Sequence, residues 1–321
     1  MNNASRLLAP LALLLGSAAD GQQLQTTPIS ASVDQGTAPQ PDATTISLGL
    51  LDQRLTVPVV LGAAGPYPFI IDTGAERTVV SRELAHVLGL VAGPTVNLTS
   101  MTGRSKVSTV VVPDLTIPAV GKSQRIEAPA LASENLGAAG LLGLDTLSGH
   151  EVMIDFEANQ MAVRPASKRR ANDASRDPDE IVVQARSKFG QLIVTEAFVG
   201  NSRIRVVIDT GSEVSMGNSA LRKRVRIKQG SIQPVMLTSV TGGKTVADYT
   251  LVPAVRIGAV QFDAVPIAFA DVAPFERFGL TKQPALLLGM DALRSFRRVE
   301  IDFPNRQVRF LMPKGAHRNA F

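Results

Sequence analysis

Two copies of one short pattern constrain this chain more than any other feature of its sequence. Residues 69–75 read Phe-Ile-Ile-Asp-Thr-Gly-Ala, and residues 206–212 read Val-Val-Ile-Asp-Thr-Gly-Ser. A run of bulky, β-branched apolar residues predicts a buried strand. Each copy therefore places one aspartate, Asp72 or Asp209, at the end of a buried strand, where a carboxylate needs a partner. The glycine two positions later lets the backbone turn tightly and approach another segment closely.

Other segments of the chain repeat in the same order. Three further pairs share sequence and follow the two aspartates along the chain. The matched pairs are residues 98–103 and 237–242, residues 140–145 and 286–291, and residues 154–156 and 301–303. The offset between the copies changes only by short insertions. We interpret this as a tandem duplication of a unit of about 120 residues, which is long enough for one compact domain.

Composition favours short strands and many turns. The chain has 321 residues and is 45% hydrophobic, so it can bury the cores of two domains. It has 20 prolines, 26 glycines, no tryptophan and few aromatic residues. This balance suits a β-rich fold better than a helical bundle. We therefore predict an all-β protein.

Composition also excludes several kinds of chemistry. The chain has no cysteine, which rules out disulfides, thiolate nucleophiles and cysteine-ligated zinc. Its three histidines, His86, His150 and His317, are far apart in sequence and none has a metal-ligand spacing. We predict neither a metal site nor a cofactor. The net charge of +5 comes from scattered Lys and Arg without interleaved aromatic residues, a pattern that does not indicate nucleic-acid binding.

The order of apolar and polar stretches divides the chain into six segments. Residues 1–19 combine Arg6, a short apolar run and small residues, which indicates a signal peptide too short to span a membrane. We therefore expect an exported protein, periplasmic or secreted. The other predicted segments are a disordered arm or linker (20–45), a first lobe (46–163), a charged linker (164–180), a second lobe (181–313) and a tail (314–321).

Each lobe is predicted to contain a short helix and hairpins around its aspartate strand. Ser81 is placed to cap a helix over residues 82–88, and the second lobe has a matching short helix over residues 218–224. Hairpins are expected in both lobes, at residues 95–112, 152–163, 233–252 and 299–311.

Two carboxylates that meet can carry out hydrolysis without a metal. Like charges at about 3 Å disfavour the ionisation of both groups, so the pair shares one proton. One member can then deprotonate a water molecule while the other hydrogen-bonds the carbonyl group under attack. Thr73 and Thr210 are placed to hydrogen-bond across to the opposite lobe, and Gly74 and Gly211 allow close backbone approach. Ordinary turns after strands use the same residue types, which is the alternative reading of these four positions.

The repeated set of motifs resembles the aspartic proteases. Each lobe carries Asp-Thr-Gly after an apolar strand and, later, an apolar-apolar-Gly element that ends at Gly143 or Gly289. The short lobes and glycine-bearing hairpins are more similar to the retropepsin-like (retroviral-type) branch than to the pepsin-type branch. The resemblance implies two tandem closed β-barrel lobes related by a pseudo-twofold axis, with Asp72 and Asp209 as the catalytic pair. It also implies that the apolar-Gly elements pack under the aspartate loops.

The resemblance further implies where a substrate would lie. The tips of two hairpins would be flaps that close over an extended peptide, and an acid four residues after each aspartate would lie near it. The residues implied are Met101, Thr102, Gly103, Val240, Thr241, Gly242, Glu76 and Glu213. The alternatives are plain surface hairpins, and salt bridges of the two glutamates with Arg77 or Arg203.

We therefore predict an aspartic endopeptidase that cleaves extended peptides or exposed loops of envelope or secreted proteins. A monomer is expected, with both lobes supplied by one chain. Two alternatives stay open: a homodimer in which like lobes pair, and a peptide-binding or scaffold protein of the same fold without turnover. The intact Asp-Thr-Gly in both copies argues against the binding protein, because a protein without turnover needs neither aspartate.

Overall fold

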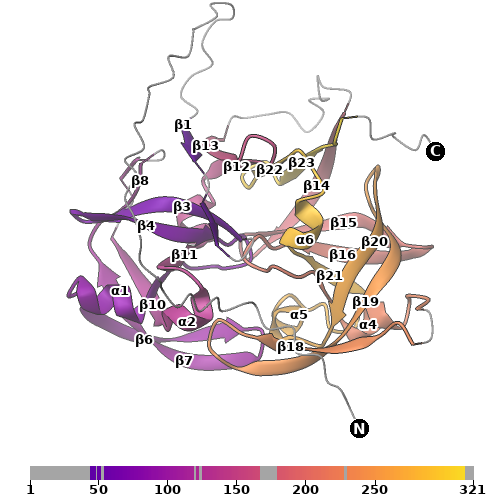
Figure 1. Cartoon of the computed structure of the whole chain (residues 1–321), viewed down its shortest axis with the longest axis horizontal. Helices are drawn as coiled ribbons and strands as arrows, with labels where there is room; N and C mark the ends of the chain where they lie inside the picture. The colour runs from indigo at the N-terminus through magenta and orange to yellow at the C-terminus, as the bar shows by residue number, and fades with distance from the viewer. Residues whose placement is uncertain are drawn as a thin grey trace, which may run out of the picture.

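The computed structural model describes residues 44–47, 49–51, 54–118, 121–122, 125–166, 179–227 and 230–314. The predicted signal peptide (1–19), nearly all of the arm (20–45), most of the charged linker and the tail after residue 314 lie outside these ranges. The described residues form two β-rich halves side by side, the first coloured indigo to magenta and the second pink through orange to yellow (Figure 1). The prediction of an all-β fold with two tandem lobes is confirmed.

The first lobe is built on a ten-stranded sheet with the order β6-β7-β10-β5-β11-β4-β3-β8-β9, and β2 pairs with β3. Its strands are β2 (Gly49–Leu51), β3 (Arg54–Leu61), β4 (Ala64–Ile71), β5 (Val79–Ser81), β6 (Val91–Ser100), β7 (Gly103–Val112), β8 (Leu115–Ile117), β9 (Gly121–Lys122), β10 (Ile126–Leu131) and β11 (Gly140–Leu142). Three short helices connect them: α1 (Arg82–Val87), α2 (Ser133–Leu136) and α3 (Leu144–Leu147).

The second lobe repeats this order within a 13-stranded sheet. Its strands are β14 (Glu180–Lys188), β15 (Gln191–Val199), β16 (Ser202–Ile208), β17 (Met216–Gly217), β18 (Gln233–Thr238), β19 (Lys244–Ile257), β20 (Val260–Phe269) and β21 (Ala285–Leu288). Its helices are α4 (Ser219–Arg222), α5 (Ala273–Arg277) and α6 (Met290–Leu293). An additional pairing of β15 with β19 curls this part of the sheet back onto itself.

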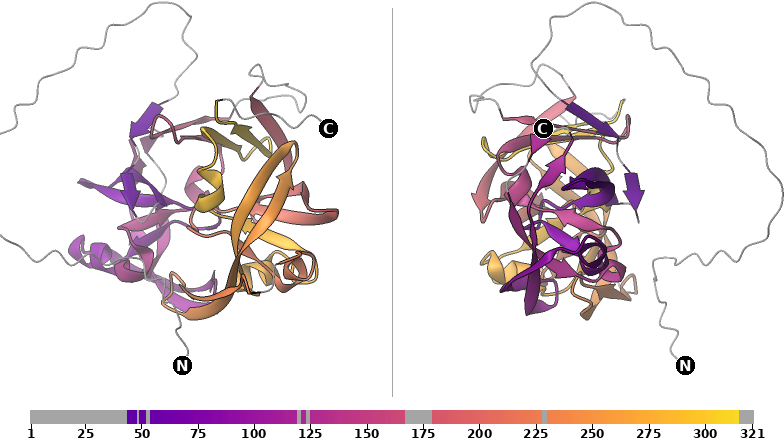
Figure 2. Two further views of the ribbon diagram at one scale, coloured as in Figure 1. Left: turned by 45° about the vertical axis from the view of Figure 1, so that its right-hand side comes forward. Right: turned by 90° about the vertical axis from the view of Figure 1, so that its left-hand side faces the viewer.

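The closing hairpins of the two lobes join the halves of the molecule. They consist of β12 (His150–Asp155) with β13 (Gln160–Pro165), and β22 (Arg298–Asp302) with β23 (Gln307–Leu311). β12 pairs antiparallel with β22, and the register places Val152 opposite Ile301 and Ile154 opposite Val299. The equivalent strands of the two repeats are thus paired around a pseudo-twofold axis. With β1 (Thr44–Ser47) and β14, these strands form the sheet across the top of the molecule (Figures 1 and 2).

The strands that carry the two aspartates lie in the interior of their lobes. β4 runs between β3, which is antiparallel to it, and β11, which is parallel to it. β16 has the same neighbours in β15 and β21. Residues 69–71 and 206–208 have at most 1% of their surface exposed. Burial of each such side chain contributes about 1.5–3 kcal/mol, so both aspartates extend from rigid, well-packed strands.

The short helices begin where capping side chains place them. The side chain of Ser81 accepts the backbone N–H of Leu84 (3.1 Å), and α1 follows as predicted. The second-lobe helix starts one residue later than the predicted range. There the side chain of Asn218 accepts the backbone N–H of Leu221 (2.9 Å), so Asn218 is the cap and not the first helical residue.

Candidate active site

The loops that follow β4 and β16 face each other across the two lobes. A methyl group added to Gly211 would lie 2.2 Å from the Asp72 carboxyl carbon, and one added to Gly74 would lie 2.7 Å from Asp209 Oδ1. Each glycine of the two motifs therefore abuts the carboxylate of the opposite lobe. Only glycine leaves room for this approach, and the two carboxylates are brought together at the lobe interface.

The threonines of the two motifs exchange hydrogen bonds between the lobes. The Thr73 hydroxyl donates to the carbonyl of Ile208 (3.0 Å), and the Thr210 hydroxyl donates to the carbonyl of Ile71 (2.7 Å). Each hydroxyl also accepts the backbone N–H of the other threonine, both at 3.1 Å. Both side chains are buried, so these bonds are protected from water. The result is a reciprocal network that holds the two aspartate loops in one arrangement.

Both carboxyl groups accept backbone hydrogen bonds from the residues that follow them. Asp72 Oδ1 accepts the backbone N–H groups of Gly74 and Ala75, both at 2.9 Å, and Asp209 accepts those of Gly211, at 3.1 Å, and Ser212. Burial, and then the negative charge of Asp72, raise the pKa of Asp209 from its ordinary value of 3.8 to about 7. Hydrogen bonds from the backbone oppose this rise only in part. A proton is therefore held at the pair up to near-neutral pH.

The apolar-Gly elements lie beneath the aspartate loops, as the family resemblance implied. The carbonyl of Leu142 accepts the backbone N–H of Asp72, and the carbonyl of Leu288 accepts that of Asp209, both at 3.0 Å. These contacts continue the parallel pairing of β4 with β11 and of β16 with β21. A methyl group on Gly143 would lie 2.4 Å from the backbone of residue 77, so the element packs tightly against the loop.

A second pair of aspartates supports the loops, and the sequence did not indicate this role. Asp145 Oδ1 accepts the backbone N–H of Thr78 (2.9 Å) and its hydroxyl (2.7 Å). In the second lobe Asp291 accepts the backbone N–H of Ser215 (3.0 Å) and its hydroxyl (2.6 Å). Burial raises the pKa of Asp291. The available signal was the recurrence of this aspartate after the apolar-Gly element in both repeats.

The two hairpin tips contact each other across the lobes. The tip between β6 and β7 contains Met101 and Thr102, and the tip between β18 and β19 contains Val240, Thr241 and Gly242. The hydroxyl groups of Ser100 and Thr241 lie 3.0 Å apart. Each tip also reaches the opposite lobe. Met101 packs against a second-lobe cluster, and Val240 packs against a first-lobe cluster.

The acid after the first motif has a partner that the sequence did not suggest. Arg277 Nε donates to Glu76 Oε1 at 2.6 Å, and Arg277 Nη2 donates to Glu76 Oε2 at 2.7 Å. The neighbouring Arg77 was therefore the wrong salt-bridge partner, because the true one comes from the opposite lobe. In the second lobe the backbone carbonyl of Glu213 accepts the N–H of Asp291 (3.1 Å).

Comparison with protein families identifies the repeated unit. A model of the family described as aspartyl protease matches residues 57–146 and, again, residues 195–292, which is more than half of the chain. The chain belongs to the aspartyl protease family. Each matched segment contains one Asp-Thr-Gly motif and ends in α3 or α6, so the predicted family and its tandem arrangement are confirmed. A comparison with curated proteins gave no match.

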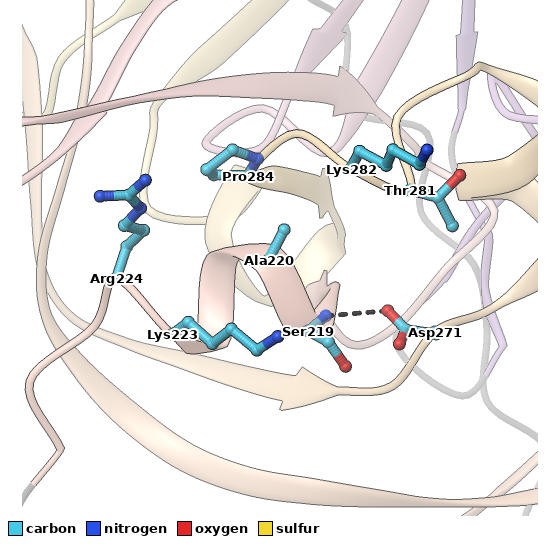
Figure 3. A pocket seen from close by; sticks show the side chains of 8 residues that line it. All are labelled: Ser219, Ala220, Lys223, Arg224, Asp271, Thr281, Lys282 and Pro284. Carbon is cyan, nitrogen blue, oxygen red and sulfur yellow. Dashed lines mark hydrogen bonds between the residues drawn. The ribbon is translucent and has the colours of Figure 1, made fainter.

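Other features of this aspartyl protease lie away from the loops. A cavity of about 550 Å³ opens on the flank of the second lobe (Figure 3). It is lined by Ser219, Ala220, Lys223, Arg224, Asp271, Thr281, Lys282 and Pro284. None of these eight belongs to an aspartate loop or a hairpin tip. Among the described residues, no group of three or more potential ligands could hold a metal ion, and no helix has the length and apolar character to cross a membrane.

Proposed function

We propose that this aspartyl protease is an endopeptidase in which Asp72 and Asp209 together activate a water molecule. One observation supports the proposal most directly. Each motif's glycine abuts the opposite carboxylate while each motif's threonine bonds to the opposite backbone. This arrangement has a clear purpose if two carboxyl groups from separate lobes must act on one atom.

The proton inventory of the pair fits peptide hydrolysis. We assign to Asp72 the role of taking a proton from water, because the pKa of its partner Asp209 is raised. Asp209, whose pKa is raised to about 7, holds the shared proton and donates it to the oxygen of the peptide carbonyl. Water then adds to the carbonyl carbon. The C–N bond breaks as Asp72 gives its proton to the leaving amine and Asp209 takes a proton back from a hydroxyl of the diol. The two carboxyl groups titrate as a pair.

The hairpin tips support an extended peptide as substrate. They contact each other through Ser100 and Thr241, and we propose that they cover a peptide bound at the aspartate loops. A peptide strand can use its backbone groups for such recognition. We propose an exported enzyme acting on envelope or secreted proteins, on the basis of the N-terminal sequence. The interlobe bonds within one chain support a monomer.

The decisive experiment uses the chain without residues 1–19 and an unfolded, reduced protein as substrate. Digests are run from pH 3 to pH 8 and analysed by mass spectrometry. We expect internal cleavage that declines as the pH rises through about 7, where Asp209 loses the shared proton. Asp72→Asn and Asp209→Asn should each abolish cleavage, with folding checked by circular dichroism.

The outcomes separate the alternatives. Loss of cleavage in both variants, with a monomer in analytical ultracentrifugation, would establish one intramolecular pair. Loss in only one variant, with a dimer, would indicate that like lobes pair. Peptide binding without cleavage at any pH would instead identify a binding protein of the same fold.

A further inference from the structure

Helix α5 belongs to the second lobe, but two of its contacts are with the first. At its start, the backbone N–H of Ala273 donates to the carbonyl of Met101 at the tip of the first flap (3.1 Å). The Met101 side chain packs in the same cluster as Phe275 of α5. At its end, Arg277 donates both hydrogen bonds of its fork to Glu76, four residues after Asp72. The helix therefore connects a flap tip to a loop that carries a reacting carboxylate.

The guanidinium group of Arg277 is held from a second side. It lies over the ring of Phe189, 4.4 Å from the ring centre. Phe189 lies in the turn between β14 and β15 with φ 53°, a left-handed conformation that is rare for an aromatic residue. Lys188, next to it, donates to the backbone carbonyl of Phe278, directly after α5. The turn therefore contacts both the Arg277 side chain and the residue that follows α5.

The same turn also reaches the backbone of the Asp72 loop. Gln191 follows the turn, is 1% exposed, and donates from its side-chain amide to the carbonyl of Gly74 (2.8 Å). A bidentate Arg–carboxylate pair fixes orientation as well as distance. The Arg277 and Glu76 side chains are 31% and 36% exposed, so their contribution to stability is small. The main effect of the Arg277–Glu76 pair is to fix the position of the loop that carries Asp72.

The other half of the molecule lacks this arginine. α2 is the counterpart of α5 in the first lobe, and Val240 of the second flap packs in one cluster with Leu136 of α2. The last turn of α2 contains no basic residue, whereas the last turn of α5 contains Arg277. Of these two described helices, α5 alone therefore has an arginine in its last turn that links it to the opposite aspartate loop.

We propose that Arg277 is a positioning residue, and that α5 couples the seating of the first flap to the placement of Asp72. This inference rests on the proposed function of the aspartate pair. When Met101 is seated on α5, the helix is fixed, and the fork of Arg277 then fixes the loop that carries Asp72. A reacting group misplaced by about 1 Å can lower the rate about 100-fold. The effect should therefore fall on kcat more than on KM.

The test measures steady-state cleavage of a fluorogenic peptide copied from a site found in the protein digest. For Arg277→Ala we expect kcat to fall about 10- to 100-fold, with KM changed by less than about threefold. Arg277→Lys keeps the charge but loses the fork, so it should restore kcat only in part. Arg297→Ala is the matched control. It removes another Arg–Glu pair between the lobes, Arg297 with Glu157 at 2.8 Å, and should leave kcat within about twofold.

A double-mutant cycle tests the coupling through α5. If Met101 and Arg277 act through the same helix, the kcat loss of the double alanine variant should be smaller than the product of the two single losses. Met101→Ala combined with Arg297→Ala should instead give the product of its single effects. Independent losses at Met101 and Arg277 would overturn the coupling.

Equal kcat values for Arg277→Ala and Arg297→Ala would overturn the positioning role. Should Arg277→Ala not fold, Glu76→Gln replaces it. This variant keeps the side-chain volume but replaces one of the two carboxylate oxygens that accept from Arg277 with an uncharged amide group. An unchanged kcat in Glu76→Gln would then overturn the role. Absence of cleavage by the wild type would reject the proposed function and this inference with it, whereas the outcomes above reject only the inference.

Discussion

The raised pKa of Asp209 predicts that replacing this residue stabilises the protein in a pH-dependent way. The folded protein holds the proton up to about pH 7, whereas the unfolded chain releases it near the ordinary value of 3.8. Between these values the native state binds one more proton than the unfolded state, so the free energy of unfolding falls as pH rises. Below pH 4 the group has no effect, and above pH 7 the loss is complete. Asp209→Asn removes this loss.

The size of the effect follows from the pKa difference. A rise from 3.8 to about 7 corresponds to about 4 kcal/mol of unfolding free energy. This is an upper bound, because the Asp209 side chain keeps partial contact with solvent, which stabilises its ionised form. The asparagine oxygen can still accept the backbone N–H of Gly211, so that the local structure is retained.

Urea unfolding at pH 4 and pH 8 measures the difference directly. We expect wild type and Asp209→Asn to differ little in pH 4 buffer, and the variant to be more stable at pH 8 by up to about 4 kcal/mol. The comparison at pH 4 is the internal control for any change in packing. Equal differences at both pH values, or a variant that is less stable at pH 8, would refute the argument that burial and the charge of Asp72 keep the proton on Asp209.

Two further changes test the geometry around the pair. Thr210→Val removes the hydroxyl that bonds to the carbonyl of Ile71 (2.7 Å), and urea unfolding should show a loss of about 3 kcal/mol. Thr210→Ser keeps the hydroxyl and should lose only about 1 kcal/mol; equal losses would contradict the role of the bond. Gly211→Ala would place a methyl group 2.2 Å from the Asp72 carboxyl carbon, so the cleavage rate should fall at least about 100-fold. Gly149→Ala, with no neighbouring atom within 4 Å, is its control, and equal rates in the two variants would contradict the reasoning.

Most local features of the fold could be predicted because they depend on neighbouring residues. The apolar run at 69–71 predicted a buried strand, and this segment is fully buried in β4. Ser81 predicted the start of α1 from its own capping side chain. The start of α4 was misjudged by one residue: Asn218 was predicted as the first helical residue, but it is the cap, a position that asparagine favours.

Features that join distant segments were harder to predict. Glu76 and Arg277 are 201 residues apart, and sequence proximity favoured Arg77 as the partner instead. The closing hairpins were predicted, but not the pairing of β12 with β22, because an edge strand does not encode which strand it will meet. The supporting role of Asp145 was also missed, since an aspartate near a strand end reads equally well as a turn residue.

The sequence by itself determined that the chain is a duplicated β protein with one aspartate at the end of a buried strand in each half. Repetition and apolar periodicity are properties of the amino-acid order itself, so they can be recognised without coordinates. Only the tertiary structure decided how the halves meet: which backbone each threonine contacts, that burial raises the pKa of Asp209, and that Arg277 faces the Asp72 loop. These depend on burial and on distances between lobes, and desolvation arises only when the two loops come together.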